Sequence, residues 1–186
     1  MKILGIQAFY YSHAAALLSD GALRFFVEEE KINRIKAQRD GFPLQGIRAA
    51  LDHEGLELED IDEIAYPIDP WRYAWTVAKA GVGSALGSLS LRGSPEPPIG
   101  RVSQFADRIL TTLQFTPPFL DRLIRQQIRY GRIPGRIPKI THVPHHRAHA
   151  ASAFYASGMD EAAIVIIDGL GETESTSIWH GRGLEL

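Results

Sequence analysis

The sequence predicts an α/β fold, because short apolar strands open the chain and strands alternate with helices near its end. Residues 3–8 and 14–19 are apolar enough to form two strands. Asp20-Gly21 follows the second strand and is a two-residue hairpin signal, since both turn positions need positive φ. Residues 22–30 then supply the returning strand. The N-terminus is therefore expected to form a three-stranded meander.

Helical and strand patterns continue through the rest of the chain. Apolar residues at helical spacing alternate with short apolar runs, and prolines and glycines separate them. This alternation favours a mixed sheet with helical crossovers. The expected helices are 44–56, 101–115, 118–132 and 145–157, and the expected strands are 61–67, 137–143, 162–167 and 175–180.

Two regions depart from this regular pattern. Residues 73–91 are rich in glycine, serine and alanine, and residues 92–100 form a proline-rich loop. The first is expected to be a helix followed by a mobile loop. Near the end, residues 180–183 resemble a hairpin turn whose return strand has only three residues. A hairpin without room for its partner strand suggests the N-terminal portion of a longer protein.

The composition is that of a globular protein. The chain has 186 residues, of which 45% are hydrophobic and 23% are charged, and its formal net charge is −2. Bulk charge therefore gives no reason to expect a nucleic-acid or membrane partner. The sequence has no cysteine, which excludes disulfides and thiol nucleophiles. The N-terminus has no signal-peptide pattern, so a cytoplasmic protein is expected.

A histidine cluster points to metal binding. If a helix begins at Pro144, His145 and His149 lie four residues apart and project from the same face. Two imidazoles at this spacing can share a divalent ion, and Asp168 at the end of a buried strand is a plausible third ligand. The alternative is a surface histidine pair on a helix whose small residues serve close packing.

The turn after this strand is a candidate phosphate site. Gly169 and Gly171 would let the backbone approach a phosphate and donate N–H groups. Ser175 is one of several hydroxyl residues that follow the turn. An ordinary β-turn between two strands explains the same glycines.

Three blocks of the sequence resemble the carbamoyltransferases that act on nodulation factors and antibiotics. The blocks are residues 3–23, residues 27–43, with their Glu-Glu-rich start and Phe-Pro end, and residues 145–172, with the pattern His-His-Arg-Ala-His followed by Asp-Gly-Leu-Gly-Glu. They occur in the order in which the family has them. The resemblance implies an actin-like, sugar-kinase-like (ribonuclease H-like) half-domain. Residues 68–136 would be a variable helical insertion, and the C-terminal lobe and an adenylate-forming domain would lie outside this chain.

The resemblance also implies a chemistry. In the family, a separate domain makes carbamoyl-adenylate from carbamoyl phosphate and ATP, and the N-terminal domain transfers the carbamoyl group to a hydroxyl of a small molecule or glycan. By this resemblance His145, His149 and Asp168 are the metal ligands, and either iron or zinc suits them. The nucleotide side of the site would include the turn. Its expected residues are Gly169, Gly171, Glu172 and Ser175.

The first two blocks supply candidate catalytic residues. Where the family shows Tyr-His-Asp-Ser, this sequence has Tyr10-Tyr11-Ser12-His13, so His13 is a displaced substitute for the family histidine. The second block lies near the acceptor side in the family. Its candidates are Glu29, Glu30 and Arg34. A solvated strand end explains the same charges.

Two other functions remain open at this point. A metal-dependent hydrolase would use the same two histidines and aspartate with a bound water. A non-catalytic remnant or regulatory binding module would explain the altered first block. A stripe of arginines in the expected helix at 118–132 and just beyond suggests an exposed or partner-docking face, or a site for an anionic ligand or RNA. These arginines are Arg122, Arg125, Arg129, Arg132 and Arg136.

Overall fold

The computed structural model describes residues 1–9, 12–36, 41–76, 78–79, 116–169 and 171–186. The chain forms two compact units. The first comprises Met1–Pro67 and Asp121–Val143, and the second comprises Ile68–Leu120 and Pro144–Leu186.

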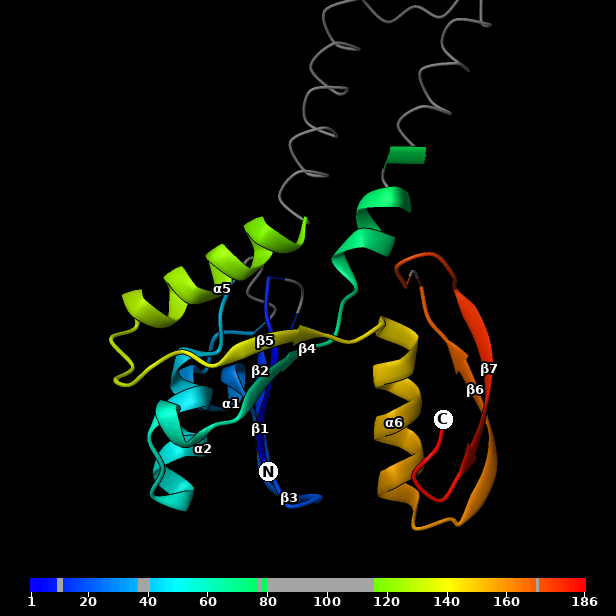
Figure 1. Cartoon of the computed structure of the whole chain (residues 1–186), viewed down its shortest axis with the longest axis horizontal. Helices are drawn as coiled ribbons and strands as arrows, with labels where there is room; N and C mark the ends of the chain where they lie inside the picture. The colour runs from blue at the N-terminus through cyan, green and yellow to red at the C-terminus, as the bar shows by residue number, and fades with distance from the viewer. Residues whose placement is uncertain (10–11, 37–40, 77, 80–115, 170) are drawn as a thin grey trace, which may run out of the picture. The chain divides into compact units, whose positions relative to one another are not determined.

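A five-stranded mixed sheet forms the centre of the first unit (Figure 1). Its strands lie in the order β3-β2-β1-β4-β5. β2 pairs antiparallel with β1 and β3, whereas β4 is parallel to β1 and β5 is parallel to β4. The predicted α/β class and mixed sheet are thereby confirmed. The strands are β1 (Lys2–Gln7), β2 (Ala14–Ser19), β3 (Ala22–Glu28), β4 (Glu63–Tyr66) and β5 (Lys139–His142).

The N-terminal meander has the predicted hairpin turn between β2 and β3. Asp20 and Gly21 have φ values of 52° and 81°, as the two-residue turn requires. The third strand ends at Glu28, two residues before the predicted end, because helix α1 (Glu29–Asn33) begins there. Glu29 is buried and turns toward the start of helix α2 (Leu44–Glu54), which a continued strand would not allow.

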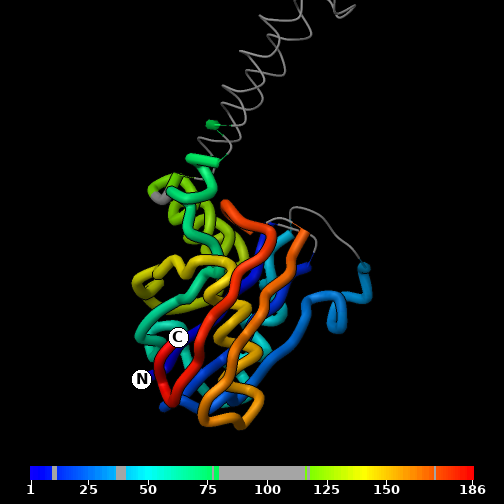
Figure 2. The backbone as a smooth tube through the Cα atoms, turned by 90° about the vertical axis from the view of Figure 1, so that its right-hand side faces the viewer, coloured from blue at the N-terminus to red at the C-terminus, as the bar shows by residue number. Residues whose placement is uncertain are grey.

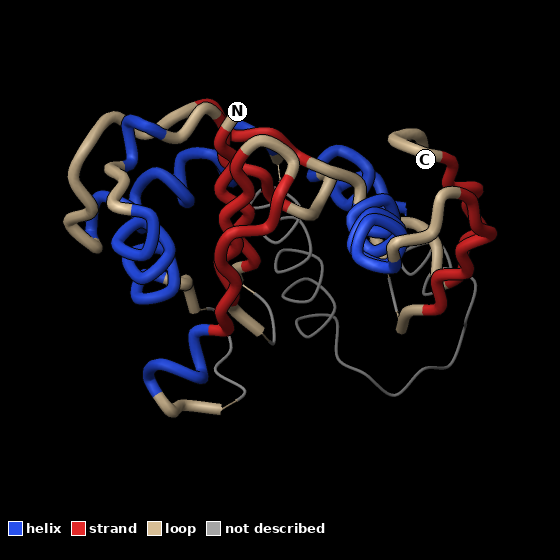
Figure 3. The backbone as a smooth tube through the Cα atoms, turned by 90° about the horizontal axis from the view of Figure 1, so that it is seen from below, coloured by secondary structure: helices blue, strands red, loops and turns tan. Residues whose placement is uncertain are grey.

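Helix α2 packs on β2 and β3 with its apolar face (Figure 3). Ile47, Ala50 and Leu51 of this face are buried. A 3₁₀ turn η1 (Leu58–Asp60) leads into β4. Helix α5 (Pro117–Tyr130) follows the predicted 118–132 helix closely and buries Ile124 and Ile128.

The second unit contains helix α6 (His145–Ser157) on one face of an antiparallel pair, β6 (Glu161–Ile167) and β7 (Thr176–Arg182) (Figure 2). Phe154 and Ile164 are buried between the helix and the two strands. Close packing here depends on Gly181, because a Cβ at this position would lie 2.8 Å from the Phe154 ring. Residues 70–76 are also helical.

Several expectations fall outside the described residues, namely the helix at 101–115, the loop at 92–100 and most of 73–91. Among the residues that the structure describes, every helix is too short or too polar to cross a bilayer.

Candidate metal centre

The two histidines and the aspartate predicted as metal ligands lie together in the second unit. Pro144 precedes the first residue of α6, and the helix places His145 and His149 one turn apart. Asp168 directly follows β6. His145 Nε2 lies 2.8 Å from Asp168 Oδ2 and 3.1 Å from His149 Nε2, and His149 Nε2 lies 3.7 Å from Asp168 Oδ2.

These three atoms are spaced as ligands of one cation are. Ligands bound about 2.0–2.2 Å from an ion lie roughly 3–3.5 Å from each other. The three side chains offer atoms that all lie within 4.8 Å of one another. Two imidazole nitrogens and one carboxylate oxygen also form a donor set that iron and zinc accept. The residues present therefore fit a divalent metal.

The directions in which the pKa values of His149 and Asp168 shift favour metal binding. Partial burial and the neighbouring His145 lower the pKa of His149, although Asp168 opposes this. Burial acts to raise the pKa of Asp168, but hydrogen bonds from His145 and from the Gly169 N–H outweigh it and lower that pKa. A neutral imidazole and an ionised carboxylate are the forms that bind a metal.

Glu172 fixes the start of the ligand-bearing helix. Its side chain is 5% exposed, and Oε1 accepts the backbone N–H of His145 at 2.9 Å and the backbone N–H of Asp69. A carboxylate at this place also interacts favourably with the positive end of α6. Burial nevertheless raises the pKa of Glu172. The carboxylate predicted to face a nucleotide is thus already engaged by two backbone donors, and its role toward a nucleotide stays a prediction.

The N–H groups of both glycines in the turn donate to acceptors at the turn itself. The Gly169 N–H donates to Asp168 Oδ1, and the Gly171 N–H donates to the carbonyl of Glu174. A Cβ at Gly171 would lie 2.7 Å from His146 Nε2, so this glycine allows close packing. Gly169 has open space where a Cβ would lie, and Ser175 is exposed. The predicted phosphate contacts are not tested by these observations.

Asp69 is a contributor that the sequence interpretation missed. Its Oδ1 accepts the backbone N–H groups of Trp71 and Arg72, which begin the helix at residue 70. An aspartate followed by proline is a helix-start signal, so the Asp69-Pro70 pair contained the information needed. Arg72 from this helix pairs with Glu174 at 3.4 Å and so balances a charge next to the glycine turn.

His146 lies beside the ligand pair but points elsewhere. It is 3% exposed, and Nδ1 lies 2.7 Å from Ser177 Oγ, which also accepts the Trp179 indole N–H. Within the described part of the chain, Nε2 has no hydrogen-bond partner. His146 therefore joins α6 to β7 and does not belong to the group of three.

The candidate catalytic residues of the first unit have structural contacts. His13 is buried, and its Nε2 accepts the Gly41 N–H at 3.1 Å. Glu29 is buried too, and its carboxylate accepts the N–H groups of Gln45 and Gly46 at 3.1 and 2.7 Å, which caps α2. Their predicted catalytic roles remain untested.

Glu30 and Arg34 lie at the two ends of the short helix α1. Glu30 Oε1 accepts a hydrogen bond from Lys31 Nζ at 3.0 Å. Arg34 is exposed, and its backbone ends α1 with a φ of 64°. The predicted roles of both residues near an acceptor stay predictions.

The sequence matches the family described as Carbamoyltransferase N-terminus over residues 2–186. The chain belongs to this family. It is 32% identical to an uncharacterized protein, sll1178, of Synechocystis sp. over 99% of this chain and 28% of that protein. It is 33% identical to nodulation protein NolNO of Sinorhizobium fredii over 97% of this chain and 22% of that protein. The carbamoyltransferase resemblance of the sequence is thereby confirmed.

A third relative and a solved structure extend these comparisons. Nodulation protein U of Rhizobium tropici is 27% identical over 97% of this chain and 26% of that protein. YeaZ from Pseudomonas aeruginosa aligns with a TM-score of 0.37 and 16% identity, covering 91% of this chain and 55% of YeaZ. The chain spans about a quarter of the length of the curated relatives that it matches.

Proposed function

We propose that this chain is the metal-binding part of a carbamoyltransferase that transfers a carbamoyl group from carbamoyl-adenylate to a hydroxyl of a small molecule or glycan. The family match over residues 2–186 supports the reaction class. The observation that carries the proposal is the convergence of His145 Nε2, His149 Nε2 and Asp168 Oδ2.

These three residues would hold a divalent cation, iron or zinc. When bound, such a cation supplies Lewis-acid polarisation of a carbonyl or phosphoryl oxygen. The three ligands come from one helix and the end of one strand. Their arrangement is therefore set by the packing of α6 on β6.

The remaining residues of the unit orient this group. Glu172 holds the backbone of His145, and the His145 ring in turn contacts Asp168. Arg72 balances the charge of Glu174 beside the glycine turn, which leaves the turn less repulsive to a nucleotide phosphate. In the transfer, the acceptor oxygen bonds to the carbamoyl carbon, AMP leaves with the phosphate oxygen, and the hydroxyl proton is released.

The chain spans about a quarter of the length of the curated relatives that it matches. We expect a further part of the full protein to make carbamoyl-adenylate from carbamoyl phosphate and ATP. Cytoplasmic location and independence from nucleic acid and membranes are part of the same proposal.

The test is a transfer assay on the protein encoded by this chain together with its downstream coding region. Labelled carbamoyl phosphate, ATP and a panel of hydroxylated small molecules and oligosaccharides are supplied, and labelled carbamate esters are measured. Product is expected with the unchanged protein and with His180→Ala, a histidine distant in sequence that pairs with Glu161. His145→Ala and His149→Ala are expected to abolish it.

Two outcomes would contradict the proposal. Metal-dependent hydrolysis of simple esters or amides by this chain alone, without carbamoyl phosphate or ATP, would favour a hydrolase at the same residues. Absence of any metal-dependent product from the longer protein would favour a regulatory module or a non-catalytic remnant.

A further inference from the structure

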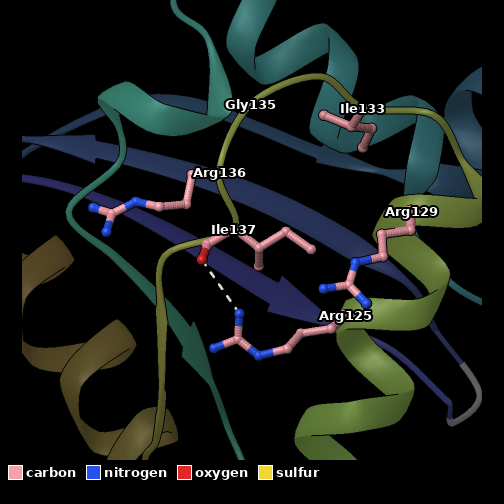
Figure 4. A pocket seen from close by; sticks show the side chains of 6 residues that line it. All are labelled: Arg125, Arg129, Ile133, Gly135, Arg136 and Ile137. Atoms are coloured by element: carbon pink, nitrogen blue, oxygen red, sulfur yellow. Dashed lines mark hydrogen bonds between the residues drawn. The ribbon is translucent and has the colours of Figure 1, made fainter.

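A second cluster of charged side chains surrounds a cavity of about 310 Å³ in the first unit. Carbamoyl transfer as proposed above does not use it. Two arginines come from α5, and a third comes from the segment that follows the helix (Figure 4). The lining residues are Arg125, Arg129, Ile133, Gly135, Arg136 and Ile137.

The wall of this cavity is held in place by specific contacts. Arg125 donates from its two terminal nitrogens to the carbonyls of Ile137 and Pro138, each at 3.2 Å, and so ties α5 to the following segment. Gly135 has a φ of +100°, and a Cβ there would lie 3.0 Å from the Glu59 backbone nitrogen. The two hydrogen bonds of Arg125 fix the backbone that faces Arg129 across the cavity, and the glycine lets this backbone approach Glu59 closely.

Among the described residues, no carboxylate forms an ion pair with the arginines of the cavity. Arg125 and Arg129 are four residues apart on α5, and both line the cavity. Like charges at this spacing repel each other. Within the part of the chain that the structure describes, Arg72 is the arginine that pairs with a carboxylate, and none of the three cavity arginines does. Arg129 and Arg136 also donate no side-chain hydrogen bond to a described residue.

An anion with several oxygens meets these conditions. A guanidinium presents donors in a planar fork that matches two oxygens of a phosphate. Arg125 keeps N–H groups beyond the two that it uses, and Arg129 offers all of its own. The lining has no aromatic side chain on which a nucleic-acid base would stack, and the cavity volume suits a small ligand.

We propose that this cavity binds the phosphate group of a small phosphorylated molecule. Arg129 is the principal donor, and the fixed Arg125 supplies its remaining N–H groups. Arg136 also lines the cavity, but Figure 4 draws its side chain directed away from the other two, so its contribution is smaller. Ile133 and Ile137 provide apolar surface for the organic part of the ligand.

The test is a calorimetric titration of the 186-residue chain with inorganic phosphate and, separately, with glycerol 3-phosphate. One saturable site is expected for each, with the ester binding more tightly because of the apolar wall. Arg129→Gln is expected to weaken binding by about tenfold or more, since it removes charge-assisted hydrogen bonds. Arg136→Gln is expected to weaken it by a smaller factor. Arg122→Gln, which removes an exposed arginine of the same helix outside the cavity, should leave binding unchanged.

Three results would overturn the proposal: no saturable binding of either ligand, an equal loss of affinity in Arg122→Gln, or tight binding of a single-stranded oligonucleotide that phosphate does not displace. Arg129→Lys keeps the charge on an exposed side chain but lacks the fork. Its affinity for phosphate is expected to lie between those of the unchanged protein and Arg129→Gln. If Arg129→Gln fails to fold, the lysine variant tests the proposal in its place.

Discussion

At Glu172 a single buried carboxylate accepts the backbone N–H groups of His145 and Asp69. The first turn of α6 carries the ligand His145, and the N–H groups of a first turn have no partners within the helix. Glu172 supplies one of these partners from 27 residues away along the chain. The residue therefore connects the glycine turn to the position of a metal ligand.

Replacement of Glu172 by alanine is expected to reduce both stability and metal binding. Two partly buried donors would lose their acceptor, which costs about 1–3 kcal/mol of unfolding free energy. Zinc affinity should fall by about tenfold, as when other outer-shell partners of a ligand are lost. Urea denaturation and zinc titration measure the two effects. Glu172→Gln keeps an acceptor oxygen and should lose less stability and less zinc affinity. An alanine variant with the same stability and zinc affinity as the unchanged protein would contradict the positioning role of Glu172.

Glu63 gives the fold a pH-dependent contribution. Its carboxylate accepts hydrogen bonds from the Thr141 hydroxyl and from Lys139 Nζ across β4 and β5, and these lower its pKa from 4.5 although burial opposes them. Because the folded-state pKa lies below the unfolded one, this stabilisation is present above pH of about 4.5 and is lost as pH falls through the lowered value.

Glu63→Gln should therefore be less stable than the unchanged protein at pH 7, by about 1 kcal/mol or less for a partly exposed ion pair. The difference is expected to shrink as the pH falls below 4.5. Urea denaturation at several pH values measures it, with the exposed Glu59→Gln as control. A stability difference between the two proteins that grows toward low pH would contradict a lowered pKa of Glu63 in the folded state.

The sequence was informative about single residues where local spacing decides their position. Two histidines four residues apart must share a helix face, and an aspartate after an apolar run must lie at the end of a strand. Glu29 and Glu172 were assigned to ligand-facing roles, yet they accept backbone N–H groups 17 and 27 residues away. Such distant caps depend on tertiary packing and have no local sequence signal.

At the scale of the elements, the contact of α6 with β7 depends on one glycine. A Cβ at Gly181 would lie 2.8 Å from Cδ2 and Cγ of Phe154, which is buried in the core of the second unit. Gly181→Ala is expected to reduce the unfolding free energy by about 1–3 kcal/mol, because the ring or the strand must shift. Thermal denaturation measures this. Gly5→Ala, whose new Cβ would first meet Ala16 at an ordinary 3.7 Å, should have little effect, and equal losses would contradict the packing argument.

Most strands and helices could be predicted because turn residues and apolar periodicity are local. The Asp20-Gly21 hairpin and the meander around it were found in this way. The parallel pairing of β1 with β4 and of β4 with β5 joins segments about 60 to 75 residues apart, and no local pattern specifies it. Here the family resemblance, and not periodicity, implied the correct fold.

At the scale of the whole molecule, part of the exposed face of the β6–β7 pair is apolar. Val165, Ile167 and Ile178 are 57%, 80% and 76% exposed. Exposed apolar strands favour self-association. Ile167→Lys with Ile178→Lys is expected to reduce association of the 186-residue chain in analytical ultracentrifugation. Leu23→Lys, on β3, should change association less. If the paired substitution had no effect, or no more than Leu23→Lys, self-association through the β6–β7 pair would be contradicted.

The central claim is that one divalent cation binds His145, His149 and Asp168, and zinc titration of the purified 186-residue chain tests it most directly. One ion per chain is expected. His145→Ala, His149→Ala and Asp168→Asn should each weaken binding by more than the roughly tenfold loss typical of an outer-shell change, whereas His180→Ala should not. Absence of a saturable site, or an equal loss of affinity in His180→Ala, would contradict the account.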